Sequence, residues 1–371
     1  MKKVTYILSF VDKSLAFEWI AERINNDKYE LSFILLSDKK PYLFNWLKER
    51  GIICFFIPHI GKKSYPNSIY KTLSILNKIK PEIIHAHLFD ACIIGLIAGK
   101  LAGINRRIHT RHNATIHHNY FPNAVKYDKF INFLSTDIIA ISENVKNILI
   151  EMEGVNKNKI HLIPHGFNFQ EFENVSIERI ETVRQKYNLF HSNKPIVGVI
   201  SRYIHWKGIQ YIIPAFKKIL QTYSDAHLVL ANASGPYNEE IEVLLKQLPK
   251  KNYTEIKFEQ DIAALYKLFD CFVHTPIDEQ SEAYGQIYVE AMAAEVPCIV
   301  TKSGIANEYI EDKKNAIVVP FKNSVYIYEA LNLLLSNNDL KTSLIQNARN
   351  DVKDRFGIDK MICKLEELYG K

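Results

Sequence analysis

The chain has 371 residues, which is long for one hydrophobic core, because a single core stops growing at about 250–300 residues. Hydrophobic residues make up 47% and charged residues 24%, a composition that excludes a disordered or fibrous chain. The net charge of +6 comes from the first half: residues 1–190 hold 26 Lys and Arg against 18 Asp and Glu, and residues 191–371 hold 21 against 23. A basic half suits a nucleic acid, an anionic membrane or a phosphorylated small molecule, although a solvated surface explains it equally well.

Along the first half, short β-branched runs alternate with amphipathic segments, a pattern typical of βαβ units and parallel sheets. Strands are predicted at residues 4–9, 30–36, 53–57, 83–85, 107–110, 138–141 and 160–163. Helices are predicted at residues 15–25, 41–50, 67–79, 91–101 and 144–151. We therefore expect a Rossmann-like domain over residues 1–168.

The alternation restarts after a polar, charge-rich stretch that ends near Lys194. Strands are predicted at residues 196–200, 228–230, 255–258, 271–274, 298–301 and 316–319, with helices between them. The fold class is therefore α/β, with two Rossmann-like doubly wound domains, the second over residues 169–352 and a last helix, about 353–371, returning to the first. Ligands in such folds bind at the carboxyl ends of the strands, so we expect the site in a cleft between the domains.

Five cysteines, Cys54, Cys92, Cys271, Cys298 and Cys363, are odd in number and widely spaced, as is typical of small core residues in a reducing compartment. The N-terminal apolar run is followed at once by charged residues, which predicts a first strand and not a signal peptide. No apolar stretch reaches about 18 residues, so no membrane span is predicted. We expect a cytoplasmic protein, peripheral at the inner face of the membrane.

The most informative motif runs from Glu282 to Glu290, eight positions apart, with Gly285 just before a predicted helix. A helix N-terminus offers free N–H groups and a positive dipole end, which suit a diphosphate, and flanking carboxylates suit sugar hydroxyls. Taken alone, this spacing is weak evidence, because two surface glutamates give it equally well.

A second motif places Arg202 and Lys207 directly after the strand predicted at 196–200. Two cations at the carboxyl end of a strand suit a departing nucleotide diphosphate, whose negative charge has to be neutralised. Taken alone, an exposed loop with two cations is an equally good explanation. The two motifs together are much less easily explained by chance.

Together, Glu282-Ala-Tyr-Gly285 through Glu290, Arg202 and Lys207-Gly208 resemble the retaining glycosyltransferases with the two-domain GT-B fold, family 4 or glycosyl transferases group 1. The resemblance covers nearly the whole chain. It includes the segments 81–87, 141–143, 159–166 and 265–270.

The resemblance implies a role for each matching residue. Arg202 and Lys207 would bind the donor diphosphate, Glu282 would hold hydroxyls of the transferred sugar, and Glu290 would bind the ribose. Backbone N–H groups of Tyr284, Gly285 and Gln286 would meet the phosphates, Gly235 stands in the nucleotide-base loop, and His112 would lie near the donor sugar and the acceptor. A structural loop histidine is the alternative for His112.

The mechanism implied is transfer from a nucleotide-diphosphate sugar with retention, without a protein nucleophile and without a cofactor. No Asp-x-Asp motif occurs, so no metal is expected. A zinc site among His85, His87, His109, His112, His117 and His118 is not expected either, because no Cys or carboxylate is evidently placed to complete it. These histidines are expected to line the cleft on the acceptor side. The segment 9–14 lacks the glycine-rich loop that often follows the first strand in the family, so donor contacts there stay unassigned.

Two rival functions stay open: a non-catalytic nucleotide-sugar-binding scaffold, and another enzyme of the same fold, such as a sugar-nucleotide epimerase or a phosphorylase. No nucleic-acid partner is expected, because no reading motif occurs. The segment 39–48, followed by Lys62 and Lys63, mixes cations with aromatic residues and predicts contact with an anionic membrane. We therefore expect a peripheral enzyme that acts on a glycan or lipid-linked acceptor in polysaccharide or lipopolysaccharide assembly. The same segment also fits an ordinary helix packed on the sheet.

Overall fold

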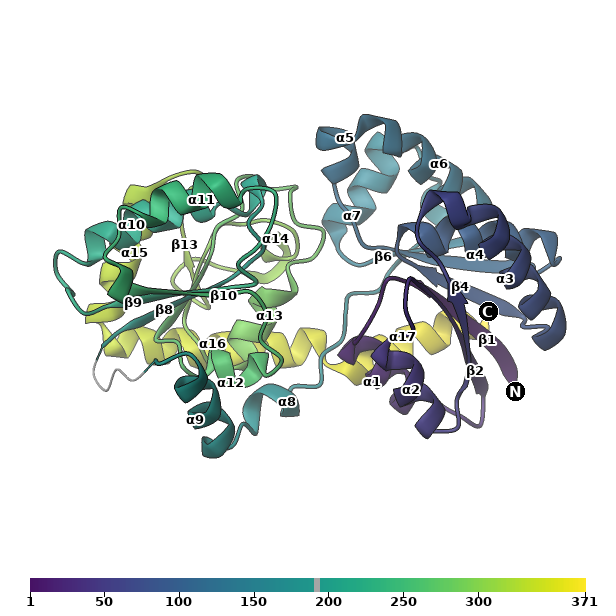
Figure 1. The fold of residues 1–371 in the computed structure, drawn as a ribbon, viewed down its shortest axis with the longest axis horizontal. Coiled ribbons are helices and arrows are strands. Elements are labelled where there is room, and N and C mark those ends of the chain that lie inside the picture. Colours follow the sequence, from purple (N-terminus) through teal and green to yellow (C-terminus); the bar gives the residue numbers. More distant parts are fainter. Residues whose placement is uncertain (190–193) are drawn as a thin grey trace. The chain divides into compact units, whose positions relative to one another are not determined.

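The computed structural model describes residues 1–189 and 194–371. The chain divides into two compact units: unit 1 is Met1–Phe167 with Ile358–Lys371, and unit 2 is Asn168–Gly357. Each unit is built around its own parallel sheet with helices on both faces (Figure 1). The α/β fold class with two doubly wound domains is confirmed.

Unit 1 has a seven-stranded sheet with the order β3-β2-β1-β4-β5-β6-β7, in which all neighbouring strands are parallel. Its strands are β1 (Lys2–Ser9), β2 (Tyr29–Ser37), β3 (Ile53–Pro58), β4 (Ile83–His87), β5 (Arg106–Arg111), β6 (Asp137–Ala140) and β7 (Ile160–Leu162). Its longer helices are α1 (Leu15–Arg23), α2 (Tyr42–Glu49), α3 (Tyr65–Ile79), α4 (Phe89–Leu101), α6 (Val125–Leu134) and α17 (Ile358–Gly370). Shorter helical segments are α5 (Ile116–Tyr120), α7 (Glu143–Asn147), η1 (Lys62–Ser64), η2 (Pro122–Ala124), η3 (Ile148–Met152) and η4 (Lys157–Lys159).

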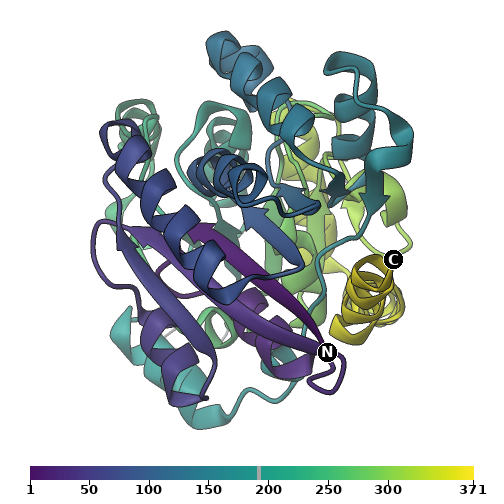
Figure 2. The same ribbon diagram turned by 90° about the vertical axis from the view of Figure 1, so that its right-hand side faces the viewer.

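The C-terminal helix α17 is part of unit 1, and both chain ends lie there (Figure 2). Its Tyr369 hydroxyl lies 2.5 Å from the Tyr6 hydroxyl and 2.7 Å from His85 Nδ1, all buried in the sheet. Arg106 donates to the carbonyls of Leu368 and Tyr369 at 2.7 and 3.0 Å, which satisfies backbone groups at the end of the helix. The last helix is thus bound to β1, β4 and β5 by polar contacts as well as by packing.

Unit 2 has a six-stranded parallel sheet with the order β10-β9-β8-β11-β12-β13. Its strands are β8 (Ile196–Ile200), β9 (His227–Ala231), β10 (Tyr253–Ile256), β11 (Cys271–His274), β12 (Cys298–Val300) and β13 (Ile317–Val318). Its longer helices are α9 (Ile177–Lys186), α10 (Ile209–Ile219), α11 (Asn238–Leu245), α13 (Gln286–Ala293), α15 (Ser324–Ser336) and α16 (Asn338–Phe356). Shorter ones are α8 (Gln170–Glu173), α12 (Ile262–Tyr266), α14 (Ala306–Tyr309), η5 (His205–Lys207) and η6 (Lys250–Asn252).

Four α-helices were not expected from the sequence: α5, α6, α8 and α9. Helix α9 lies in the polar stretch, has only Val183 buried and so lacks an apolar stripe, and it begins after Ser176, whose hydroxyl accepts from the Arg179 amide. Helix α6 carries aromatic residues on its exposed face, which obscures the helical period of its buried residues.

The segment 39–48, for which membrane contact stays a prediction, is partly buried. It forms α2, and Leu43, Trp46 and Leu47 are buried in the core of unit 1. The Arg50 guanidinium lies 3.8 Å from the centre of the Trp46 ring and helps to cover it. The helix therefore packs on the sheet as an ordinary amphipathic helix.

Cys363 is exposed and the other four cysteines are buried.

Candidate functional site

The candidate site in unit 2 lies at the carboxyl edge of its sheet. Strands β8 and β11 are parallel neighbours, with Cys271 opposite Val197, so the segments that follow them leave the sheet at the same edge. The segment after β8 carries Lys207, and the segment after β11 carries Glu282. The sheet order thus brings together two motifs that are 75 residues apart.

Glu282 is the centre of this arrangement. Lys207 Nζ lies 2.5 Å from Glu282 Oε1, and His274 Nε2, at the end of β11, lies 3.0 Å from the same oxygen. Burial alone would raise the pKa of Glu282, but the Lys207 charge and the His274 hydrogen bond hold it well below the usual range. Burial lowers the pKa of His274, so this imidazole is neutral at pH 7 and donates to the carboxylate.

Gly208 fixes the position of Lys207. It has φ of +76°, and an added Cβ would lie 1.8 Å from the carbonyl oxygen of Thr275. Only glycine permits both the left-handed backbone and this approach of the two loops. The close contact holds the segment after β8 against the segment after β11.

Glu290 lies in a different environment, in helix α13. Its two carboxylate oxygens accept from Gln286 Nε2 at 2.7 Å and from the Tyr266 hydroxyl at 3.1 Å. Burial raises the pKa of Glu290, and these two neutral donors only partly oppose the rise. The two glutamates of one motif therefore differ: a cation lowers the pKa of Glu282, whereas Glu290 has only neutral donors and its pKa is raised.

The remaining predicted residues of unit 2 surround these pairs. Gly285, with φ of +88°, precedes α13, and the first amides of this helix, from Gln286 on, have no acceptor inside it. Tyr284 has a buried side chain packed edge-on against Phe356, so only its backbone is suited to bind a ligand. Arg202 is exposed, and no ion pair to it is found in the described part of the chain.

Gly235 lies in the loop after β9. An added Cβ there would lie 2.2 Å from the Tyr203 carbonyl oxygen, and Tyr203 in turn donates its amide to Ser234 O at 3.1 Å. The glycine thus lets this loop lie against the loop that carries Arg202.

In unit 1, His112 follows β5 and lies beside His87 at the end of β4. His87 Nδ1 and His112 Nε2 are 3.0 Å apart, and the His165 ring, after β7, stacks on His112 with 5.5 Å between centroids. Burial, with a contribution from His165, lowers the pKa of His112 to about 3, so it is neutral at pH 7. This histidine can donate or accept a hydrogen bond but carries no charge for a phosphate.

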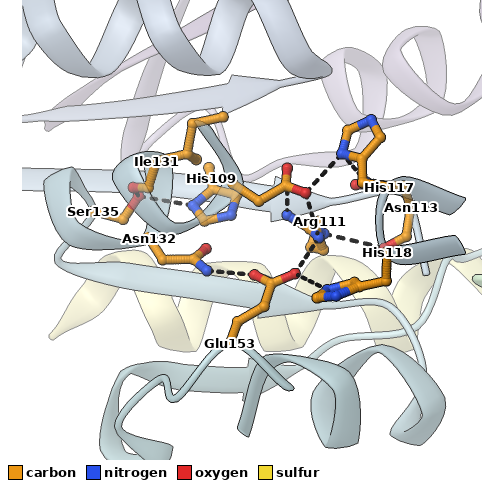
Figure 3. Close-up of polar contacts among 10 residues, drawn as sticks. His109, Arg111, Asn113, His117, His118, Ile131, Asn132, Ser135 and Glu153 are labelled. Carbon is orange, nitrogen blue, oxygen red and sulfur yellow. Dashed lines mark hydrogen bonds and ion pairs between the residues drawn. The ribbon is translucent and has the colours of Figure 1, made fainter. Parts of the chain in front are cut away.

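Of the other histidines, His85 and His109 are buried inside unit 1 and hydrogen bonded there. His85 binds Thr110 and Tyr369, and His109 is buried against Ser135 at 2.7 Å. His117 and His118 do meet carboxylates, Asp128 at 2.6 Å and Glu153 at 3.2 Å, contrary to the expectation that none was placed for them (Figure 3).

Arg111 occupies the centre of that cluster. Its guanidinium contacts Asp128 at 2.8 Å and Glu153 at 2.5 Å, and Asn132 donates to the second oxygen of Glu153 at 2.6 Å (Figure 3). A cation therefore stands where a metal ion would have to bind. In residues 1–189 and 194–371 no group of three or more His, Cys, Asp or Glu side chains is arranged to hold a metal ion.

Sequence reasoning missed His274, Tyr266 and the Gln286 side chain as partners of the two glutamates, and Glu153 as a partner of Arg111. His274 could have been found, because it ends a predicted strand beside the strand that precedes Arg202. Glu153 carries no such signal, since only the folded chain places it beside Arg111.

Comparisons with known proteins identify the family. The family model described as Glycosyl transferases group 1 matches residues 180–351, and the model described as Glycosyltransferase Family 4 matches residues 20–171. A Staphylococcus aureus relative, the capsular polysaccharide biosynthesis glycosyltransferase CapM, is 27% identical over 312 residues, which are 81% of this chain and 80% of the relative. An Escherichia coli relative, UDP-Gal:alpha-D-GlcNAc-diphosphoundecaprenol alpha-1,3-galactosyltransferase, is 22% identical over 363 residues, 94% and 90% of the two chains.

Solved structures agree on the fold. A glycosyltransferase from Rickettsia africae has a TM-score of 0.82 at 21% identity, covering 99% of this chain and 97% of its own. Anabaena HepE in complex with UDP-glucose has a TM-score of 0.83 at 19% identity, covering 100% of both chains. The chain therefore belongs to glycosyltransferase family 4 and is a glycosyltransferase of the GT-B type.

Proposed function

We propose that this glycosyltransferase moves a sugar from a nucleotide-diphosphate sugar to an acceptor hydroxyl with retention of configuration and without a metal ion. The observation that carries the proposal is the contact of Lys207 and His274 with Glu282 at the carboxyl edge of the unit 2 sheet. This arrangement puts a fixed cation and a fixed anion side by side, which suits a diphosphate and the hydroxyls of the sugar attached to it.

Lys207 and Arg202 are the groups that would neutralise the leaving diphosphate. An ammonium group has three donors, and the contact with Glu282 uses one of them. Arg202 adds an exposed guanidinium on the same loop, suited to bidentate binding of phosphate. With two cations supplied by side chains, the negative charge that develops on the diphosphate needs no metal ion to balance it.

Glu282 is suited to hold sugar hydroxyls and poorly suited to attack carbon. Its pairing with Lys207 and His274 keeps it ionised, so it accepts hydrogen bonds, but the same partners reduce its nucleophilicity. We therefore propose that the acceptor hydroxyl attacks from the face that the diphosphate leaves, and that a phosphate oxygen takes its proton. Retention of the anomeric configuration follows from that geometry.

Glu290 and the start of α13 would hold the nucleoside side of the donor, the carboxylate on ribose hydroxyls and the first helix amides on the phosphates. His112, being neutral, would hydrogen bond to the transferred sugar or the acceptor. The named relatives act in capsular polysaccharide biosynthesis and on a diphosphoundecaprenol-linked sugar. We propose a related glycan or lipid-linked acceptor here, in surface polysaccharide or lipopolysaccharide assembly.

The test is a thermal-shift and donor-hydrolysis screen across UDP-, GDP- and ADP-sugars, starting with UDP-glucose because of the Anabaena complex. A donor that raises the unfolding temperature and is slowly hydrolysed by the wild type, but not by Glu282→Ala, supports the proposal. The matched control is Glu279→Ala, which removes an exposed carboxylate from the same loop.

Two further measurements complete the test. NMR of the transferred sugar with the active donor reports its anomeric configuration, and an inverted product would contradict the mechanism. Full activity in excess EDTA is expected, and restoration by a divalent cation would contradict metal independence. Binding without hydrolysis or transfer in the presence of any acceptor would favour the non-catalytic scaffold.

A further inference from the structure

Unit 1 exposes a group of aromatic side chains on α5, η2 and α6. Phe133 is 70% exposed and Phe121 57%, and three more aromatic residues are 42–43% exposed. These three are Tyr120, Tyr127 and Phe130. Single exposed rings are common on protein surfaces, but a contiguous group is unusual, because each ring loses favourable burial.

Lysines accompany these rings. Lys126 and Lys129 alternate with Tyr127, Phe130 and Phe133 on the outer face of α6, all at the i, i+3 and i+4 spacing of one helix side. Lys62 Nζ lies 5.4 Å from the Tyr127 ring centre, and Lys100 Nζ lies 5.3 Å from the Phe133 ring centre. We call the five rings with these four lysines the α5–α6 surface; α5 and α6 lie together at one end of unit 1 in Figure 1.

A pocket of about 460 Å³ opens within the α5–α6 surface. Phe89, Phe121 and Tyr127 line it with His117, and Lys62 stands at its wall. Its rings meet edge to face, Phe89 with Tyr127 at 6.0 Å and with His117 at 5.4 Å. An aromatic pocket with one cation suits an apolar chain that carries an anionic group.

The segments that form this surface contain few acidic residues. The segment 116–134 contains one acidic residue, Asp128, and the segment 62–79 contains none. Asp128 is buried and points inward to Arg111 and His117, at 2.8 and 2.6 Å (Figure 3 shows the surrounding contacts). The buried ion pairs therefore fix α6 to β5 from below while the outer face stays cationic and aromatic.

We propose that the α5–α6 surface docks on an anionic lipid bilayer, with its rings at the headgroup level and its lysines on lipid phosphates. The argument is charge complementarity together with the residue types: Phe and Tyr mixed with Lys, and no exposed acid, match the interface of an anionic membrane. A protein partner of ordinary composition would leave these lysines without a matching set of carboxylates. The inference places membrane contact on α5 and α6; in α2 the side chains of Leu43, Trp46 and Leu47 are buried.

The test is co-sedimentation of the full chain with vesicles of equal parts phosphatidylglycerol and phosphatidylcholine, at low and near-physiological ionic strength. Wild-type protein is expected to sediment with these vesicles and not with pure phosphatidylcholine. Two double variants should each lower the partition coefficient at least roughly tenfold. One is Phe130→Ser with Phe133→Ser, and the other is Lys126→Glu with Lys129→Glu. All four side chains are exposed, so folding should survive, and circular dichroism checks it.

Matched controls exist in unit 2. Phe258→Ser removes a ring that is 74% exposed, and Lys246→Glu with Lys251→Glu changes the net charge by the same amount as the α6 pair. These controls should bind vesicles like the wild type. Equal loss of binding in test and control variants would overturn the proposal, as would no binding of the wild type to either kind of vesicle.

A dimer formed through this surface would also overturn the proposal. If sedimentation velocity shows a dimer that Phe130→Ser with Phe133→Ser converts to monomer, the surface is a contact between two copies of the chain. The proposal does not depend on the donor chemistry, because hydrolysis of a soluble donor should be the same in the α6 variants as in the wild type.

Discussion

Lys207 and Glu282, from loops that follow neighbouring strands, meet with 2.5 Å between Nζ and Oε1, and His274 shares the same oxygen. The three side chains form one unit: the lysine keeps the buried carboxylate ionised, and the neutral imidazole donates to it. Removing any one changes the state of the other two, so single substitutions should affect the donor site as a whole.

Lys207→Met should lower transfer by about 100-fold or more, because one fixed positive charge is lost where the diphosphate would develop charge. Glu282→Gln should keep the fold, since its amide oxygen still accepts from His274 and Lys207, yet lose sugar binding. The measurement is kcat and KM for the donor that the hydrolysis screen identifies. Lys217→Met, a substitution of an exposed lysine of the same unit, is the control. Unchanged kcat/KM in Lys207→Met would remove Lys207 from the mechanism.

The two glutamates should give opposite dependences of stability on pH. Folding lowers the pKa of Glu282, so its stabilising contribution is full above its unfolded pKa of about 4.3 and is lost as the pH falls toward the folded value. Folding raises the pKa of Glu290, so its contribution is full below about pH 4.3 and is lost as the pH rises through the folded value.

Each Gln variant lacks the titration of its site. Relative to wild type, Glu282→Gln should lose stability as the pH rises from about 2 to 5, and Glu290→Gln should gain stability as the pH rises from about 4 to 7. Urea unfolding at several pH values measures both differences. Changes of the same sign for the two variants with rising pH would contradict the environments assigned to the two carboxylates.

Gly208→Ala tests the close approach of the two donor-site loops. The new Cβ would stand 1.8 Å from Thr275 O at a positive φ, so we expect a loss of about 3–5 kcal/mol in the free energy of unfolding and weaker donor binding. Gly103→Ala, with φ of +73° and no atom within 4 Å, is the control and should cost about 1–2 kcal/mol. Equal costs at both positions would mean that the loops separate freely.

The fold was predictable from sequence because parallel strands covered on both faces give continuous apolar runs, such as Ile196–Ile200. The sequence predicted that Lys207 and Glu282 both follow strands. It did not predict their contact, since neither motif determines the order of the strands in the sheet. Tyr266 and His274 were missed because their polar atoms matter only once buried against a carboxylate. The burial of Trp46 could not be predicted from the sequence, since an amphipathic helix looks alike whether its apolar side meets a sheet or a lipid.

Arg111 lies in a buried charge cluster, with its guanidinium between two carboxylates. Arg111→Met should destabilise the protein by about 3–5 kcal/mol, because Asp128 and Glu153 would be left buried beside each other without a cation. Arg111→Met combined with Asp128→Asn and Glu153→Gln should recover much of that loss, since the removed charges were costly to bury in the first place. Lys129→Met, an exposed lysine next to Asp128 in sequence, is the control and should change stability by less than about 0.5 kcal/mol. Chemical unfolding of the wild type and the three variants measures all these differences. If the triple variant is no more stable than Arg111→Met alone, the guanidinium acts through packing or its bond to the Asn113 carbonyl and not by neutralising the two carboxylates.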